Sequence, residues 1–305
     1  MISSNLSSRL APWLFVWIWS TGYLAAKYGL PYAEPFTLLA YRFALTLLFL
    51  APIIFLLKRP WPSSRRAILH LTVAGLLIHG IYLGGIFQAI KWGMPAGLSA
   101  MIIGLQPLGM AMVASIMLNE AVSKRQWLGL GLGLLGLYFV LFERFNFSGA
   151  AVLLGFPIWA LVIMVVSLLS ISLGMIYQKR YCSDMDIISG TLIQYSSAFL
   201  FVLAVASVFE AGTVEWSLPF VATLAWQVLG LSIGAILLLM AMIRKDASVR
   251  VASYFYLIAP LVALQAWYLF DETLGFASAA GVVLIAFGVG LARPLKDQQP
   301  GTKKL

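Results

Sequence analysis

The segment GLQPLGMAMVASIMLNE, residues 104–120, has a counterpart in IAPLVALQAWYLFDE, residues 258–272. Each segment places a proline within an apolar run and ends on a glutamate, thirteen residues after the proline in the first and twelve in the second. After each glutamate, glycines follow at the same two intervals, nine and sixteen residues on. The prolines are 153 residues apart, and this spacing predicts a chain built from two related halves.

Apolar runs of this kind fill most of the chain. Of its 305 residues, 62% are hydrophobic and only 10% are charged, which is more apolar surface than a soluble fold can bury. A helix of about 20 apolar residues crosses the bilayer hydrocarbon while pairing its own backbone groups. We therefore predict an all-α integral membrane protein with ten transmembrane helices, near residues 11–29, 36–57, 67–90, 95–118, 125–142, 154–178, 187–209, 219–243, 247–270 and 274–292.

The basic residues predict the orientation of these spans. With the N-terminus inside, sixteen of the 20 Lys and Arg fall on the cytoplasmic side, three fall outside, and Arg42 lies within a span. The positive-inside rule then places both termini in the cytoplasm of a multi-pass protein of the cell inner (cytoplasmic) membrane. The net charge of +9 is thus a signal of topology, and no basic-aromatic motif indicates a nucleic-acid partner.

Each half would hold five spans, an odd number, so the second half enters the membrane from the opposite side. The sequence therefore predicts two five-helix inverted repeats around a central cavity, residues 1–146 and 147–292, followed by a basic cytoplasmic tail, 293–305. Inverted repeats are typical of secondary transporters that alternate between two related conformations. An ancestral duplication retained in a non-transporting scaffold is the other interpretation.

Several motifs resemble the EamA family of the drug/metabolite transporter superfamily. They are Trp19-Ser20-Thr21-Gly22-Tyr23, Arg42, Pro107, Asn119-Glu120, and Asp271-Glu272 before a glycine-rich last helix. The resemblance implies a basket of ten helices, export of amino acids and related metabolites, and a supporting or dimer-forming role for spans five and ten. The second copy departs from the pattern, with Ser172 in place of Trp19 and no arginine matching Arg42.

Polar and aromatic side chains within the spans are the candidate substrate-binding residues, because polar groups in hydrocarbon are costly and face the interior of a bundle. An aromatic, methionine-containing cavity would suit an aromatic or other neutral or amphiphilic metabolite. Packing or a position in the interfacial aromatic belt is the alternative for each. The candidates are Trp17, Ser20, Tyr23, His79, Tyr82, Met101, Gln106, Tyr177, Gln194 and Tyr254.

Charged and helix-breaking residues form a second group. Arg42 either attracts a carboxylate or phosphate, or extends to the outer interface or to Glu34. Glu120 and Glu272 could carry protons, but their positions at span ends favour capping or local pairing. Pro107 and Pro260 predict kinks that line the cavity or bend during gating, with static packing as the alternative.

Glycines at 129, 133 and 136 in the fifth span, and at 281, 288 and 290 in the tenth, predict faces for close helix contact. We expect these faces to pack within a repeat or between protomers.

The leading hypothesis is a secondary transporter of small organic metabolites, most of all amino acids, that works as an exporter by alternating access. Alternatives are a drug or cation efflux carrier, a nucleobase or nucleoside carrier, and a scaffold. No P-loop and no paired catalytic groups occur, so we expect no enzyme. The lone Cys182 and the lack of a Cys/His cluster predict neither metal nor cofactor. The expected partners are a small-molecule substrate and the lipid bilayer, in a monomer or homodimer.

Overall fold

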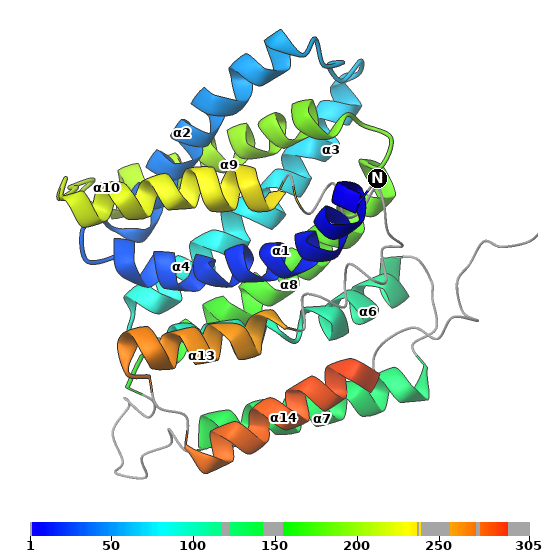
Figure 1. Cartoon of the computed structure of the whole chain (residues 1–305), viewed down its shortest axis with the longest axis vertical. Helices are drawn as coiled ribbons and strands as arrows, with labels where there is room; N and C mark the ends of the chain where they lie inside the picture. Colours follow the sequence, from blue (N-terminus) through cyan, green and yellow to red (C-terminus); the bar gives the residue numbers. More distant parts are fainter. Residues whose placement is uncertain are drawn as a thin grey trace, which may run out of the picture.

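The computed structural model describes residues 2–117, 123–142, 155–236, 238, 257–272 and 275–291. These residues form helices joined by turns (Figure 1), with one antiparallel bridge between Ala33 and Val214. The all-α class is therefore confirmed for this part of the chain. The helices are α1 Ile2–Gly29, α2 Pro35–Leu56, α3 Arg65–Gly75, η1 Leu76–Ile81, α4 Tyr82–Lys91, α5 Ala96–Ile103, α6 Gln106–Met117, α7 Lys124–Phe142, α8 Ile158–Tyr181, α9 Ile187–Phe209, α10 Leu218–Ala225, η2 Trp226–Ala235, α13 Ile258–Phe270 and α14 Phe276–Leu291.

Six helices of the described part are long and apolar enough to cross a membrane. They coincide with six of the predicted spans, and η1 and η2 are π-helical stretches within two of them. The remaining predicted spans fall on α1, α7, α13 and α14. The total of ten spans and the inverted repeat stay predictions. The six are Pro35–Leu56, Arg65–Lys91, Ala96–Met117, Ile158–Tyr181, Ile187–Phe209 and Leu218–Ala235.

Capping side chains explain where several helices begin. The Ser64 side chain accepts a hydrogen bond from the Ala67 N–H at the start of α3, and Ser217 accepts one from the Phe220 N–H at the start of α10. Asp186 accepts from the N–H groups of Ile188 and Ser189 at the start of α9. These caps satisfy amide groups that have no partner within the helix.

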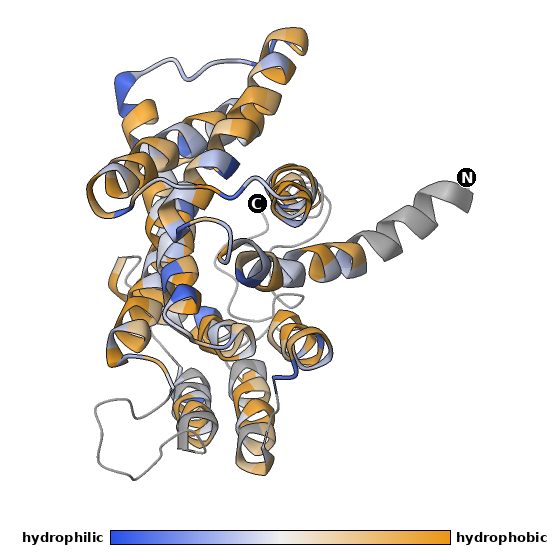
Figure 2. Ribbon diagram, turned by 90° about the vertical axis from the view of Figure 1, so that its left-hand side faces the viewer, coloured by the Kyte–Doolittle hydropathy of each residue, from blue (hydrophilic) through white to orange (hydrophobic). Residues whose placement is uncertain are grey.

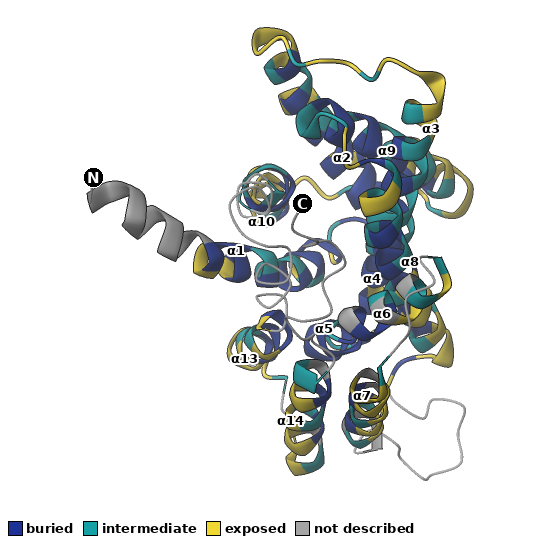
Figure 3. Ribbon diagram, turned by 90° about the vertical axis from the view of Figure 1, so that its right-hand side faces the viewer, coloured by how far each residue is buried: buried dark blue, intermediate teal, exposed yellow. Residues whose placement is uncertain are grey.

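The outer faces of the helices are apolar, as a bilayer requires. Large apolar side chains such as Leu48, Ile116, Val208 and Phe287 are exposed. Figure 2 shows apolar residues on the outward faces of the helices, and Figure 3 shows the buried residues concentrated where α2, α4, α8 and α9 meet. A surface of this kind is stable only when lipid covers it, so the structure supports a membrane protein.

Contacts between the two predicted halves organise the bundle. Helix α8 packs against α4, η1 and α6, whereas α9 packs against α2 and α3. Helix α1 contacts α13 and η2, and α7 lies beside α14 along one edge (Figure 1). In every one of these pairs, one helix precedes residue 146 and the other follows residue 147, so neither half buries its apolar faces alone.

The fourth predicted span is interrupted immediately before its proline. Helix α5 ends at Ile103, and α6 starts at Gln106 with Pro107 as its second residue. Proline fits the first turn of a helix because its missing N–H would have no partner there. Pro260 likewise lies in the first turn of α13 and is exposed. Both prolines therefore begin a helical segment in the described structure.

The glycine faces of α7 and α14 meet each other. A Cβ atom on Gly136 would lie 2.5 Å from the Gly281 carbonyl oxygen, and one on Gly288 would lie 2.4 Å from the Gly129 carbonyl oxygen. Only glycine permits backbones to approach so closely. These glycines therefore pack α7 against α14, across the two predicted halves and not within one of them.

Candidate substrate-binding site

A cluster of polar side chains is buried inside the bundle, and we call it the central polar cluster. Each member is at most 6% exposed. The cluster draws on five segments that are distant in sequence: α1, α2, the junction of η1 and α4, α9, and η2. Its members are Tyr23, Arg42, His79, Tyr82, Gln194, Tyr195 and Ser232.

Arg42 on α2 is the cation of the cluster. Its Nε donates a hydrogen bond to Ser232 Oγ at 3.0 Å. Tyr82 and Tyr195 lie near its guanidinium. Arg42 is 6% exposed, so it does not extend to the interface, and the described Glu34 carboxylate instead accepts from the Ala211 N–H at 2.8 Å. The two alternatives of interfacial extension and pairing with Glu34 were therefore wrong.

His79 and Tyr195 form the aromatic part of the cluster. Their rings stack with centroids 4.4 Å apart and an interplanar angle of 22°. The Gln194 side chain lies close to His79, and the Ser232 side chain lies close to Tyr195. The Arg42 and His79 branches are thus joined through Ser232 and Tyr195.

Tyr23 and Tyr82 extend the cluster toward α1, and their side chains lie close together. Tyr82 is the first residue of α4 and directly follows the π-helical η1, which carries His79. π-Helical turns are rare and occur frequently at functional sites. The second one, η2, carries Ser232.

The 153-residue spacing of the predicted repeat relates four residues of the cluster to one another. Adding 153 to Arg42 gives Tyr195, and adding 153 to His79 gives Ser232. The Arg42–Ser232 hydrogen bond and the Tyr195–His79 stack therefore join positions that the predicted repeat makes equivalent. Tyr195 and Ser232 were absent from the predicted site, although the repeat spacing applied to Arg42 and His79 would have identified both.

Other predicted site residues make different contacts. Trp17 is 50% exposed and contacts Trp226 edge-on, and the hydroxyl of Ser20 donates to the carbonyl of Trp17 within the same helix. Met101 is buried in the core that also contains Tyr23, Tyr82 and Tyr195, and the Gln106 side chain donates to Met110 Sδ. Tyr254 and Glu120 fall outside the described residues.

Tyr177 belongs to a second aromatic group, near the predicted cytoplasmic end. Its hydroxyl lies 2.7 Å from His70 Nδ1, and the His70 ring stacks on Tyr181 with centroids 4.7 Å apart. This group is separate from the central polar cluster, so the structure divides the predicted aromatic residues between two places.

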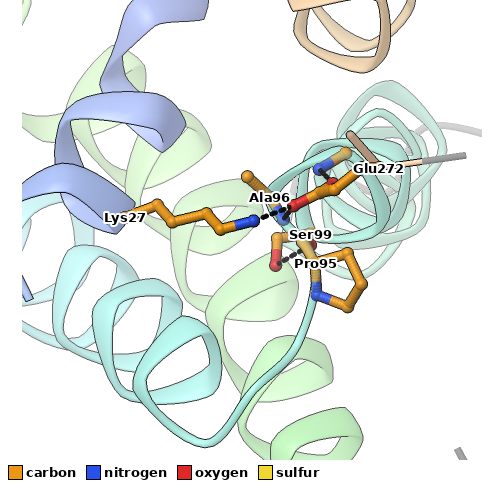
Figure 4. A network of polar contacts seen from close by, with 6 residues as sticks. Lys27, Pro95, Ala96, Ser99 and Glu272 are labelled. Atoms are coloured by element: carbon orange, nitrogen blue, oxygen red, sulfur yellow. Dashed lines mark hydrogen bonds and ion pairs between the residues drawn. The ribbon is translucent and has the colours of Figure 1, made fainter. Parts of the chain in front are cut away.

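Glu272 joins helices at the end of the bundle opposite to the Tyr177 group (Figure 4). We call this set of contacts the Glu272 clamp, and it consists of Lys27, Ala96, Gly97 and Glu272. Lys27 Nζ donates to Glu272 Oε1 at 2.7 Å, and the N–H groups of Ala96 and Gly97 donate to the two carboxylate oxygens at 3.1 Å each. A carboxylate at a helix N-terminus is favourable because it pairs free amide groups and opposes the helix dipole. Glu272 thus caps α5, a helix of the other half.

A second glutamate joins the halves in the same manner. Both carboxylate oxygens of Glu210, just after α9, accept from the N–H groups of Phe36 and Thr37 at the start of α2, at 2.8 and 2.7 Å. The nearby Glu215 N–H donates to the Tyr32 carbonyl at 2.8 Å. By the predicted topology, the Glu272 clamp and these contacts all lie at the outer end.

A groove of about 610 Å³ lies elsewhere, on the surface between α3 and α9. Its walls are mostly apolar and include the exposed Trp61 and Leu200. It therefore differs from the central polar cluster in both place and chemistry. Among the residues that the structure describes, no three His, Cys, Asp or Glu side chains gather as metal ligands would.

Comparison with known proteins agrees with this architecture. Residues 11–142 match the EamA-like transporter family. Over 247 residues, the chain is 27% identical to an uncharacterized transporter, YvbV, of Bacillus subtilis, covering 80% of this chain and 75% of that protein. A probable amino-acid metabolite efflux pump of Salmonella typhimurium is 29% identical over 44% of this chain and 42% of that protein. A protein of the same description from Escherichia coli is 28% identical over 56% of this chain and 52% of that protein. The chain thus spans about half the length of these two relatives. A solved crystal structure shares the fold with a TM-score of 0.62 at 18% identity, covering 94% of this chain and 96% of the other.

Proposed function

We infer that this protein, a membrane transporter whose residues 11–142 carry the EamA-like family sequence, exports small organic metabolites, amino acids foremost, from the cytoplasm by alternating access. The single observation that carries the proposal is the central polar cluster. Polar groups are expensive inside a membrane-spanning bundle and are employed there for substrate or ion handling. The cluster meets this description with side chains from both predicted halves.

The paired contacts across the bundle support alternating access. Helix α1 packs on η2, and α8, its counterpart in the second half, packs on η1. Helix α2 likewise contacts η2, whereas α9 contacts η1. Two halves that hold each other through equivalent contacts can exchange roles about a central site, which is how inverted repeats alternate. The Glu272 clamp and the Glu210 contacts support a state closed at the outer end.

The relatives and the cluster together support the proposed substrate class. Two relatives are named as probable amino-acid metabolite efflux pumps. The tyrosine and histidine rings of the cluster provide flat faces, and Arg42, Gln194 and Ser232 provide hydrogen-bonding groups. An amino acid with an aromatic or other neutral side chain fits both features.

Counterflow in proteoliposomes tests the function. Vesicles preloaded with an unlabelled amino acid should accumulate the labelled compound faster than empty vesicles, and the rate should saturate with concentration. An open pore would not saturate and a scaffold would give no exchange. The panel should include aromatic and aliphatic amino acids, nucleosides and amphiphilic cations, because exchange of another class would keep transport but replace the substrate proposed here.

Cysteine labelling tests the orientation. Ser63 and Thr213 are both exposed, and the proposal places them at the inner and outer ends of the bundle. In intact cells, a membrane-impermeant maleimide should label Thr213→Cys and should label Ser63→Cys only after lysis. The native Cys182 provides a low background, because burial raises the pKa of its thiol and thereby lowers the reactive thiolate fraction. Labelling of Ser63→Cys from outside would invert the proposed topology.

A further inference from the structure

Arg42 is a buried cation whose charge no described carboxylate balances. None of the seven described Asp and Glu residues forms an ion pair with it. The sequence gives the wider reason, since all eleven Asp and Glu residues fall outside the ten predicted spans, whereas Arg42 lies within one. A charge in the membrane interior is costly unless a partner of opposite sign meets it.

The hydrogen bonding of Arg42 leaves the planar end of the side chain available. Among the described contacts, the guanidinium donates through Nε to Ser232, and its two terminal amino groups have no protein acceptor. Those two groups form the fork that binds both oxygens of a carboxylate in parallel. Ser232 fixes the orientation of the guanidinium, because its Oγ accepts the hydrogen bond from Nε.

We propose that Arg42 binds the carboxylate of the transported molecule, so that the substrate supplies the negative charge that the bundle lacks. This proposal rests on the function proposed above and makes it more specific. The charge favours a carboxylate over other groups. One carboxylate neutralises Arg42, a phosphate dianion would leave an excess negative charge, and a cation would be repelled.

A structural role for Arg42 is the competing explanation. Arginine could join α2 to η2 through Ser232 without touching substrate. The two roles differ in what they predict for substrate analogues, because a structural arginine lowers the transport of all analogues alike. A binding arginine discriminates among them by their carboxylate.

The first experiment uses the unaltered protein and varies the substrate. Counterflow of the best-transported amino acid is competed with the free acid, its carboxamide, the corresponding decarboxylated amine, and an aryl phosphate of similar size. We expect the carboxamide and the amine to compete at least tenfold more weakly than the acid. Equal competition by the acid, amide and amine would overturn the carboxylate proposal while counterflow itself keeps the transport function. Preferential competition by the aryl phosphate would overturn it as well.

The second experiment asks whether substitution of Arg42 changes the preference for the acid over the amide. In Arg42→Gln, the ratio of acid to amide competition should fall toward one, and Arg42→Lys should keep part of it because the charge remains. Arg66→Gln, on the exposed first turn of α3, is the matched control and should leave the ratio unchanged. The ratio is read only from variants that elute as folded protein. A folded Arg42→Gln that retains the acid preference would refute the proposal. If Arg42→Gln does not fold, Arg42→Lys is the deciding variant. Lysine lacks the planar fork of arginine, so an unchanged ratio of acid to amide competition in Arg42→Lys would also refute the proposal.

Discussion

Replacing Gly288 by leucine is expected to destabilise the folded protein by on the order of 3 kcal/mol, because overpacking forces backbones apart. A Cβ at this position would meet the Gly129 carbonyl oxygen at 2.4 Å and the Gly133 nitrogen at 2.8 Å. Neither of these is the end of a flexible side chain, so α7 and α14 must separate. The loss should be visible as a lower melting temperature and a smaller monodisperse peak in detergent.

Gly290→Leu is the control for this substitution. Gly290 lies on the same helix, two residues further on, and a Cβ there would meet nothing within 4 Å. The same leucine should therefore be tolerated, with a change within about 0.5 kcal/mol. Equal destabilisation by both variants would mean that the loss does not come from the close backbone contact at Gly288.

Glu272→Lys is expected to abolish counterflow, because it places a cation against Lys27 and against the positive end of α5. Lys27→Met should have a smaller effect, no more than about fivefold, since a partly exposed ion pair contributes roughly 1 kcal/mol or less. The lysine side chain is 33% exposed and that of Glu272 is 12% exposed. Rates are measured at matched amounts of reconstituted protein.

The charge-exchanged double variant Lys27→Glu/Glu272→Lys separates two explanations of the Glu272 clamp. If the ion pair alone matters, restoring it in the reversed sense should restore transport. We expect no rescue, because a lysine at position 272 cannot accept the hydrogen bonds from the Ala96 and Gly97 N–H groups. Rescue to near the original rate would show that helix capping contributes little.

The sequence predicted features that are determined within a single helix, such as its position and its buried polar residues. Apolar length placed a helix on each described span, and the polar residues His79, Tyr82 and Gln194 were identified because polar groups in hydrocarbon are costly. The glycine faces of α7 and α14 were also predicted as contact surfaces.

Features that depend on the pairing of distant segments were not predicted. Lys27 and Glu272 are separated by 245 residues, and neither reveals the other by sequence spacing. The capping role favoured for Glu272 is present, but the helix that it caps is α5, which lies in the other predicted half. Trp17 was chosen for depth in the membrane, but depth does not fix which face of α1 it occupies, and it is half exposed.

The π-helical turns η1 and η2 have a consequence for comparing relatives of this protein. A π-helical stretch holds more residues per turn than an α-helix, so one deletion can convert it to α-helix without shortening the span noticeably. The narrower turn compensates for the missing residue, so side chains beyond the deletion would keep their direction, whereas those within the stretch would be displaced around the helix. A single-residue gap within residues 76–81 or 226–235 of an alignment would therefore mark a reoriented His79 or Ser232, and two homologues of equal hydropathy could present different chemistry at the centre of the bundle.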